Sequence, residues 1–301
     1  MPLVSVAVIT YNSSKYVLET LESIKEQTYQ NIELIVSDDC STDNTVQICK
    51  EWIEKNKPRF VRTQVVTVEK NTGVSANCNR AEDACQGEWV KLIAGDDLLL
   101  PNCIQDYVEY VGNKQDAYCV FGKIEIFDNR NKIIQNDKWP DYSIFELNSP
   151  QNQYEYIIRK GNGIPASTCF YNRMKMIELG VRCDERIPFI EDRPRWLQLL
   201  KKGVLLYYMD KTVVRYRTSH KDSLSSGVLY SDKYYSSGRL VYFYYYFPEK
   251  YEKDKDSCIK DLVQYETRIY MNYISVLNST AFRLGSFLLK PIYLLKRFLQ
   301  K

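Results

Sequence analysis

The sequence opens with short apolar runs that alternate with segments in which apolar residues recur every three or four positions. The second kind of segment predicts helices at residues 15–27 and 73–84. The short runs have the length of buried strands, and they predict strands at residues 4–10, 32–37, 62–68 and 89–93. Strands that alternate with helices at this spacing predict an α/β fold, with a parallel or mixed sheet covered by helices on both faces.

Polar residues follow three of these four strands directly. In an open α/β sheet, ligands bind in the crevice beyond the carboxyl ends of the strands. We therefore expect the three polar groups to face one site: Thr10-Tyr11-Asn12, Asp38-Asp39 and Asp96-Asp97.

The pattern changes after about residue 117. A strand at residues 118–127 turns at Asp128-Asn129, and we expect the shorter strands and hairpins that follow to continue the same sheet. Further elements are predicted in this half: a helix at residues 195–202 and strands at 204–208 and 212–217.

From about residue 228 the pattern is helical, and its last segment is basic and amphipathic. Residues 282–301 combine apolar side chains with five basic ones: Arg283, Lys290, Lys296, Arg297 and Lys301. Such a segment can lie in a membrane interface, or it can dock as a terminal helix on the domain or on another subunit. Both readings stay open.

Composition and charge narrow the class of protein. The 301 residues are 45% hydrophobic and 26% charged, as in an ordinary globular chain. A net charge of +3 with dispersed Lys and Arg argues against a nucleic-acid partner. The nine cysteines form no CxxC pair, and no signal peptide or membrane-spanning run is visible, so we expect reduced thiols and a cytoplasmic location.

The pair Asp96-Asp97 is the first candidate for chemistry. It follows a buried strand and precedes Pro101, so two carboxylates are expected where the chain leaves the sheet. Carboxylate oxygens of this kind suit Mg²⁺ or Mn²⁺ shared with phosphate groups. The alternative is an acidic pair at a helix start, where negative charge is also favourable.

Four segments together resemble the family-2 glycosyltransferases of the GT-A fold. They come in the family's order and spacing: residues 4–12, residues 34–43, Asn71-Thr72-Gly73-Val74-Ser75 and Ala94-Gly95-Asp96-Asp97. The resemblance extends to about residue 225 through Glu191-Asp192. It implies a mixed, mainly parallel sheet flanked by helices, with a C-terminal helical extension. We expect a GT-A domain at residues 1–227, with a nucleotide-binding half (1–115) and an acceptor half (116–227), and a helical region at 228–301.

The activity that the resemblance implies is inverting transfer of a single sugar. The donor would be a nucleotide-sugar, with UDP the expected nucleotide, and the acceptor a hydroxyl of a glycan or of a lipid-linked acceptor. Mn²⁺ or Mg²⁺ would be the cofactor. Assembly of a bacterial surface polysaccharide, by an enzyme in the cytoplasm or held at the inner face of the cell membrane, fits this chemistry.

The resemblance also implies roles for individual residues. Asp97 would be the direct metal ligand and Asp96 a contact to the ribose or the donor sugar. Tyr11 would pack on the base, and Asp39 would accept a hydrogen bond from it. The implied nucleotide-binding set is Thr10, Tyr11, Asn12, Asp39, Asn77 and Asp96. A packing role for Tyr11 and a helix-capping role for Asp39 are the structural alternatives.

A second acidic pair, Glu191-Asp192, matches the family's catalytic pair. Asp192 would be the general base and Glu191 its support, because a carboxylate must take the proton of the attacking hydroxyl. A helix cap before Pro194 is the alternative. His220 would complete the metal site, but it lies one residue further from Tyr216-Arg217 than in the family, and a loop histidine is an equal alternative.

Other classes fit the sequence less well. Asp192-Arg193-Pro194-Arg195-Trp196 ends like the QxxRW motif of processive synthases, but Asp192 stands at the Gln position, which favours a non-processive enzyme. A sugar-phosphate nucleotidyltransferase needs a glycine-rich basic loop after the first strand, and a dinucleotide-binding oxidoreductase needs GxGxxG there; residues 10–14 supply neither. An inactive GT-A-like binding protein stays an alternative.

Overall fold

The computed structural model describes residues 1–136, 139–161, 163–218, 237–238, 240–248, 256 and 259. The chain divides into two compact units, residues 1–241 and 242–301. The boundary predicted between residues 227 and 228 lies outside the described residues, as do His220 and the basic segment 282–301. In the second unit the described part includes one π-helical turn, η4 (Tyr242–Tyr246).

One sheet organises the first unit. Within the described residues it has eight strands in the order β3-β2-β1-β4-β7-β6-β8-β5. The strands are β1 (Val4–Thr10), β2 (Ile32–Asp38), β3 (Arg62–Thr67), β4 (Trp89–Ala94), β5 (Leu98–Leu99), β6 (Cys119–Phe127), β7 (Phe170–Asn172) and β8 (Tyr207–Arg217). Four pairs are parallel (β1–β2, β1–β4, β2–β3, β6–β8), whereas β7 runs antiparallel to β4 and β6, and β5 to β8. The predicted α/β class with a mixed, mainly parallel sheet is confirmed.

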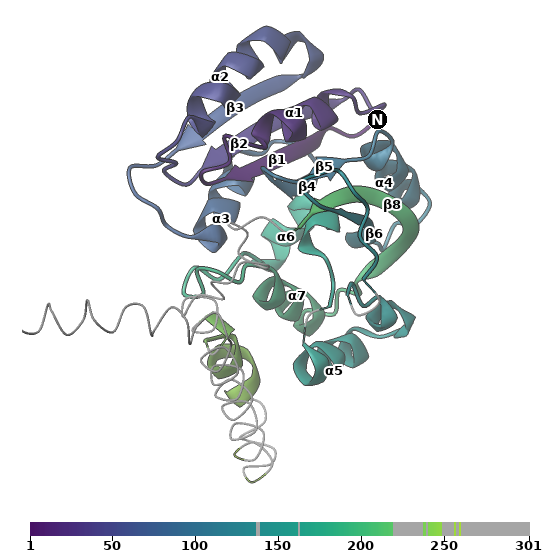
Figure 1. Ribbon diagram of the computed structural model, residues 1–301. Coiled ribbons are helices and arrows are strands. Elements are labelled where there is room, and N and C mark those ends of the chain that lie inside the picture. Colours follow the sequence, from purple (N-terminus) through teal and green to yellow (C-terminus); the bar gives the residue numbers. More distant parts are fainter. Residues whose placement is uncertain are drawn as a thin grey trace, which may run out of the picture. The chain divides into compact units, whose positions relative to one another are not determined.

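Helices connect and cover these strands (Figure 1). They are α1 (Val17–Lys25), α2 (Thr45–Asn56), α3 (Val74–Ala84), α4 (Cys103–Gly112), α5 (Pro150–Lys160), α6 (Arg173–Leu179) and α7 (Asp192–Lys201). Short 3-10 turns lie at η1 (Lys57–Arg59), η2 (Ser143–Glu146) and η3 (Ala166–Thr168). In the described part of the chain no helix is both long and apolar enough to cross a membrane.

The two faces of the β1–β2 region differ in chemistry. Val6 and Leu34 belong to the apolar core, which α1 and α2 join from one side of the sheet. The opposite face carries Ser5 and Ser37, and α3 covers it (Figure 1). The hydroxyl of Ser37 donates a hydrogen bond of 2.7 Å to Asn77 Oδ1 of α3. This polar contact fixes α3 against the end of β2.

One strand prediction in the second half was wrong. Residues 204–208 and 212–217 were expected to be two strands, but β8 runs through residues 207–217 without a break. Its pairing with β6 shifts register between Phe121, opposite Tyr208, and Lys123, opposite Thr212. The polar residues Asp210 and Lys211, which lie between the two predicted strands, therefore belong to a β-bulge, which leaves extra residues on one strand of a pair.

Candidate functional site

The carboxyl ends of β1, β2 and β4 lie side by side at the point where the strand order reverses. The backbone N–H of Asp39 donates to Thr10 O at 3.0 Å, and that of Gly95 donates to Ile9 O at 3.0 Å. A Cβ on Gly95 would lie only 2.8 Å from Thr10 Cγ2, so glycine lets the loop before Asp96 press against β1. Such a reversal point is where open α/β sheets bind ligands.

The loop after β1 contributes Thr10, Tyr11 and Asn12. Thr10 is buried, and its hydroxyl donates a 2.7 Å hydrogen bond to Asp38 Oδ2. Asn12 adopts a φ of 52°, and its Oδ1 accepts from the backbone N–H of Thr42 at 2.8 Å. Tyr11, between them, is 50% exposed. The loop is thus held at both sides, and it presents one aromatic side chain to solvent.

Asp39 is buried beneath the segment that precedes α3. Its Oδ1 accepts from the hydroxyl of Thr72 at 2.6 Å and from Arg80 Nη2 at 2.9 Å. Its Oδ2 accepts from the Gly73 N–H at 2.8 Å, and the Thr72 N–H lies 3.0 Å from both oxygens. A carboxylate offers about four lone-pair sites, so these donors fill it. A ligand N–H can bond Asp39 only if one donor moves, and the rotatable Thr72 hydroxyl is the one that can.

Asn77 lies one turn into α3 and is 4% exposed. Its amide donates to Thr10 O at 3.2 Å, and its Oδ1 accepts from Ser37 at 2.7 Å and from Arg80 Nη2 at 3.0 Å. These bonds tie α3 to the ends of β1 and β2. The described contacts of Asn77 are therefore to the protein framework under the site.

The two aspartates after β4 have different surroundings. Asp97 is 2% exposed, and its Oδ1 accepts the backbone N–H of Arg217 at 2.9 Å. Burial, together with the charge of Asp96, raises the pKa of Asp97 well above its usual value. Asp96 is partly exposed, and its backbone oxygen accepts from Arg217 Nε at 2.9 Å. Of the pair, Asp96 has the carboxyl that is more accessible to a ligand.

Arg217, at the end of β8, contacts this turn through both its backbone and its side chain. It is 3% exposed, and its guanidinium lies between the rings of Tyr16 and Phe127, with centroid distances of 4.5 Å and 4.4 Å. Its Nη2 also donates to Glu19 at 2.8 Å. These contacts make Arg217 a support of the acidic turn.

The segment that leads into Glu191-Asp192 packs against the start of α3. The hydroxyl of Ser75 donates to Ile187 O at 2.6 Å. Gly73, with a φ of 92°, approaches so closely that a Cβ on it would lie 2.8 Å from both Cβ and O of Pro188. Glu191 follows three residues later and immediately precedes α7. The second acidic pair thus follows a segment that touches the loop bonded to Asp39.

Glu191 and Asp192 titrate as a pair. Burial, and next the charge of Asp192, raise the pKa of Glu191 to about 8. Asp192 is partly exposed, and its Oδ1 accepts the N–H of Arg193 at 2.6 Å. A carboxyl group whose pKa is raised by burial and by a neighbouring carboxyl group is a candidate for a functional site.

The family model of glycosyl transferase family 2 matches residues 5–180. The chain belongs to glycosyl transferase family 2. This match covers the three strand ends, the Asp39 network and the Asp96-Asp97 turn. The predicted family and the predicted class of enzyme, a glycosyltransferase, are confirmed.

Curated relatives align over most of the chain. An uncharacterized glycosyltransferase of Methanocaldococcus jannaschii, MJ1057, is 24% identical over 259 residues, which are 85% of this chain and 82% of the relative. The putative teichuronic acid biosynthesis glycosyltransferase TuaG of Bacillus subtilis is 27% identical over 225 residues, 75% of this chain and 82% of the relative. The alignments therefore extend beyond the part that the family model matches.

A solved structure shares the fold. The crystal structure of S. aureus TarS 1-349 in complex with UDP-GlcNAc superposes with a TM-score of 0.60 at 22% sequence identity, over 79% of this chain. The chain covers 65% of that structure and 39% of a longer TarS crystal structure. At this identity the likeness supports the family-2 fold alone.

Arg195 and Trp196, the Arg-Trp of the synthase-like motif, are buried in this family-2 domain. Arg195 is 3% exposed, forms an ion pair with Glu82 of α3 and lies over the ring of Tyr171, 5.2 Å from its centroid. The Trp196 ring meets Phe121 edge-on at 5.0 Å. Both side chains therefore pack inside the domain.

Two residues of the Asp39 network escaped the sequence analysis, Thr72 and Arg80. Thr72 was part of a matched motif but received no role. Arg80 follows Asn77 by three positions, and residues so spaced share a helix face. That spacing was the available signal, because one face of α3 carries both contacts to the strand ends.

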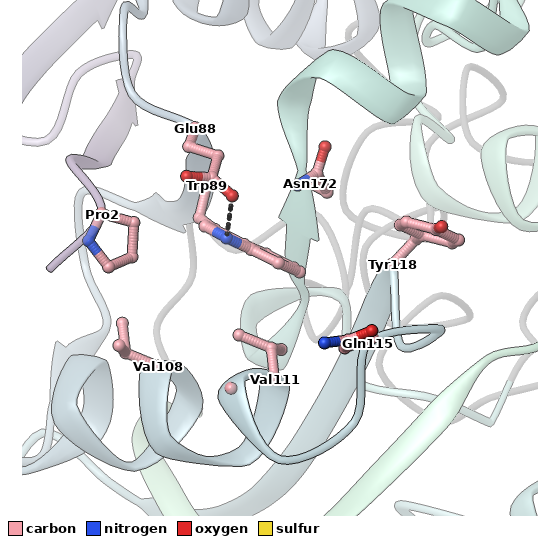
Figure 2. A pocket seen from close by; sticks show the side chains of 9 residues that line it. Pro2, Glu88, Trp89, Val108, Val111, Gln115, Tyr118 and Asn172 are labelled. Atoms are coloured by element: carbon pink, nitrogen blue, oxygen red, sulfur yellow. Dashed lines mark hydrogen bonds between the residues drawn. The ribbon is translucent and has the colours of Figure 1, made fainter.

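One hollow in the described residues lies away from these candidate residues. It has a volume of about 480 Å³ and lies at the amino ends of β1 and β4 (Figure 2). Its lining comprises Pro2, Glu88, Trp89, Val108, Val111, Gly112, Gln115, Tyr118 and Asn172. None of these is basic, so the lining offers no cationic side chain to a phosphate group.

The described residues contain no group of three or more His, Cys, Asp or Glu side chains that could hold a metal ion. His220, the further ligand expected from the resemblance, lies outside the residues described. The eight described cysteines are free, and seven of them are buried, so they are not arranged as a metal site.

Proposed function

We propose that the chain is an inverting glycosyltransferase that moves one sugar from a UDP-sugar to a hydroxyl of a glycan or a lipid-linked acceptor. The observation that carries the proposal is the convergence, in a family-2 domain, of the strand ends bearing Tyr11, Asp39 and Asp96. The segment leading to Asp192 packs on the same region through Gly73. A donor site and a base are thus supplied by neighbouring parts of one fold.

The proposed donor site is formed by the residues that follow β1 and β2. The exposed ring of Tyr11 offers a surface on which a nucleobase can pack. Asp39 would accept a hydrogen bond from the base once the Thr72 hydroxyl turns away, and Asn12 would hold the loop. The UDP-GlcNAc complex of TarS supports UDP as the nucleotide. The teichuronic acid role in the printed name of TuaG supports a surface polysaccharide as the product.

A divalent cation suits the turn after β4. Mg²⁺ is commonly bound through one or two carboxylates together with substrate phosphates, so a cluster of three protein ligands is not required. The sequence favoured Asp97 as the direct ligand, but its burial against Arg217 argues for a supporting role. We assign Asp96 to the cation and keep His220 as a further candidate. A cation bound there would offset the negative charge of the departing diphosphate.

Asp192 is the proposed general base. It would take the proton of the acceptor hydroxyl while that oxygen bonds to the anomeric carbon and the bond from that carbon to the diphosphate breaks. A single displacement of this kind inverts the anomeric configuration. Asp192 is partly exposed, whereas burial raises the pKa of Glu191 to about 8, so we assign the base to Asp192 and a supporting role to Glu191.

Calorimetry with UDP and Mn²⁺, paired with a turnover assay on a panel of nucleotide-sugars, tests these assignments. We expect Asp192→Asn to keep UDP affinity and to lose about 10²–10⁴-fold in turnover, the usual contribution of a general base. Full turnover in Asp192→Asn would exclude it as the base.

The same assay separates the two aspartates of the turn. Asp96→Asn should lose the gain in UDP affinity that Mn²⁺ provides, whereas Asp97→Asn should retain that gain and change thermal stability. The reverse pattern would return the ligand role to Asp97.

A further inference from the structure

Arg80 joins three parts of the site that are far apart in the sequence. From α3 its Nη2 donates to Asp39 Oδ1 at 2.9 Å and to Asn77 Oδ1 at 3.0 Å. Its Nη1 donates to the hydroxyl of Thr72 at 3.1 Å. The Asp39 side chain in this ion pair is 3% exposed and that of Arg80 is 19% exposed. The planar guanidinium therefore fixes the direction of the carboxylate as well as offsetting its charge.

The arrangement is not one that folding alone favours. A buried ion pair is weak evidence for stability, because removing two charges from water opposes their attraction. The Nε of Arg80 is also a buried donor for which the described part of the chain supplies no acceptor. A costly, incompletely bonded charge at the edge of a ligand site calls for a functional explanation.

We propose that Arg80 is a positioning residue that sets which nucleobase the site accepts. This inference rests on the proposed function, in which Asp39 contacts the base. A carboxylate held by a guanidinium is an acceptor only, so it bonds a base whose ring nitrogen carries a hydrogen, as N3 of uracil and thymine and N1 of guanine do. Cytosine presents a lone pair at N3, and it would face the carboxylate with no hydrogen to share.

Arg80 also explains how the filled carboxylate can receive the base. The Thr72 hydroxyl now donates to Asp39 and accepts from Arg80 Nη1. When the base N–H takes the position on Asp39, the hydroxyl can rotate and still keep its bond from Arg80. The exchange then leaves neither the carboxylate nor Thr72 without a partner.

Without the Arg80 guanidinium, the preference of the site for uracil over cytosine should weaken. A buried carboxylate that loses its counter-charge tends to become neutral, and a protonated carboxyl is a donor as well as an acceptor. It can then bond the N3 lone pair of cytosine. Loss of Arg80 should therefore change the ratio of affinities for two nucleotides that share the same diphosphate.

The experiment compares UDP and CDP binding by calorimetry, with Mn²⁺ present, on the full chain. We expect the wild type to prefer UDP by about 100-fold or more, because a site built to bond an N–H strongly rejects an analogue that lacks it. Arg80→Met should reduce that ratio about tenfold or more, and Arg80→Lys, which keeps the charge without the fork, should restore part of it. Arg182→Met is the matched control, because Arg182 forms an exposed 2.8 Å ion pair with Asp83, which lies on α3 like Arg80.

The outcomes separate the inference from the function on which it rests. If the wild type binds no UDP, the proposed function fails. If it binds UDP and Arg80→Met lowers both affinities equally, Arg80 is only structural and the inference is overturned. Should Arg80→Met not fold, Arg80→Gln replaces it, since its amide is neutral but still donates hydrogen bonds. An unchanged UDP-to-CDP ratio in that variant overturns the inference as well.

Discussion

The Thr72 hydroxyl occupies a position on Asp39 that the nucleobase of the proposed donor would need. Its 2.6 Å bond is the shortest of the bonds that fill the carboxylate, and it is the one whose donor can rotate. In Thr72→Val no such bond must be exchanged, so UDP affinity should rise about 3- to 10-fold, which is the worth of a typical net hydrogen bond. Calorimetry with UDP measures it.

Thr72→Ser is the control for this prediction, because it keeps a hydroxyl and should behave like the wild type. A fall in UDP affinity in Thr72→Val, with Thr72→Ser unchanged, would mean that the hydroxyl bonds the nucleotide itself.

Glu191 makes stability depend on pH in a direction opposite to that of most carboxylates. Its pKa is raised from 4.5 to about 8 in the folded chain. Between these values the folded state holds more protons than the unfolded state, so stability falls as pH rises through this window and the loss is complete above it. Glu191→Gln stays neutral and avoids that loss. Relative to the wild type, its free energy of unfolding should increase by on the order of 4 kcal/mol from pH 5 to pH 8.5.

Chemical denaturation at the two pH values measures the effect, with Glu51→Gln, exposed on α2, as the control. Equal pH dependence in the wild type and in Glu191→Gln would contradict the raised pKa. Such a result would also remove one reason for assigning the base to Asp192 and not to Glu191.

At the scale of single residues, the strand pattern predicted the acidic turn, but only the family resemblance ranked its two aspartates, with Asp97 as the metal ligand. Adjacent identical residues carry no signal of which side chain faces the crevice. The distinction comes from Arg217, whose backbone N–H binds Asp97 across 120 positions of chain. Long-range burial of this kind is absent from any local pattern.

At the scale of elements, the close approach of α3 to the segment before α7 depends on Gly73. Gly73→Ala adds a strained positive φ and a clash with Pro188, so we expect a loss of about 2–4 kcal/mol in stability. Gly180→Ala is the matched control, because Gly180 also has a positive φ, 62°, but no atom within 4 Å of the added Cβ. Its loss should be about 1 kcal/mol, as expected for backbone strain alone.

Thermal unfolding measures the loss of stability in Gly73→Ala and in Gly180→Ala. Equal losses would mean that the contact between Gly73 and Pro188 does not contribute to stability. A larger loss in Gly73→Ala, accompanied by lower turnover, would link this contact to the position of Glu191-Asp192.

The elements of the first half were predictable because each strand is a continuous apolar run between polar residues. Predicted and observed bounds of β1 agree at residues 4–10. The helix α4, at the end of the first half, was not predicted, nor were α5 and α6 in the second half, although α5 begins with a Ser149 cap before Pro150, a recognisable start signal. The β8 bulge escaped because Asp210 and Lys211 are exposed, so their polarity resembles that of a turn.

At the scale of the whole molecule, the sequence could not show that α3 links the two acidic regions. The helix α3 bonds Asp39 through Arg80. It also bonds the segment before α7, where Asn79 Nδ2 donates to Cys183 O at 3.0 Å, and Asn79 and Cys183 are 104 positions apart in the sequence. Only the family resemblance brought Asp39 and Asp192 into one site before the fold was known, because periodicity reports on neighbours along the chain and not across it.

The basic segment 282–301 carries the last prediction, which concerns where the enzyme works. Removing it should weaken binding to vesicles that contain anionic lipid, because basic side chains near a charged surface contribute on the order of 1 kcal/mol each. Flotation of the full and truncated chains with anionic and neutral vesicles measures this. A full-length variant with Arg283, Lys290, Lys296, Arg297 and Lys301 changed to Gln keeps the apolar residues and isolates the charge. Equal flotation of all three proteins would instead favour a helix docked on protein, since such a contact leaves its apolar face unavailable to lipid.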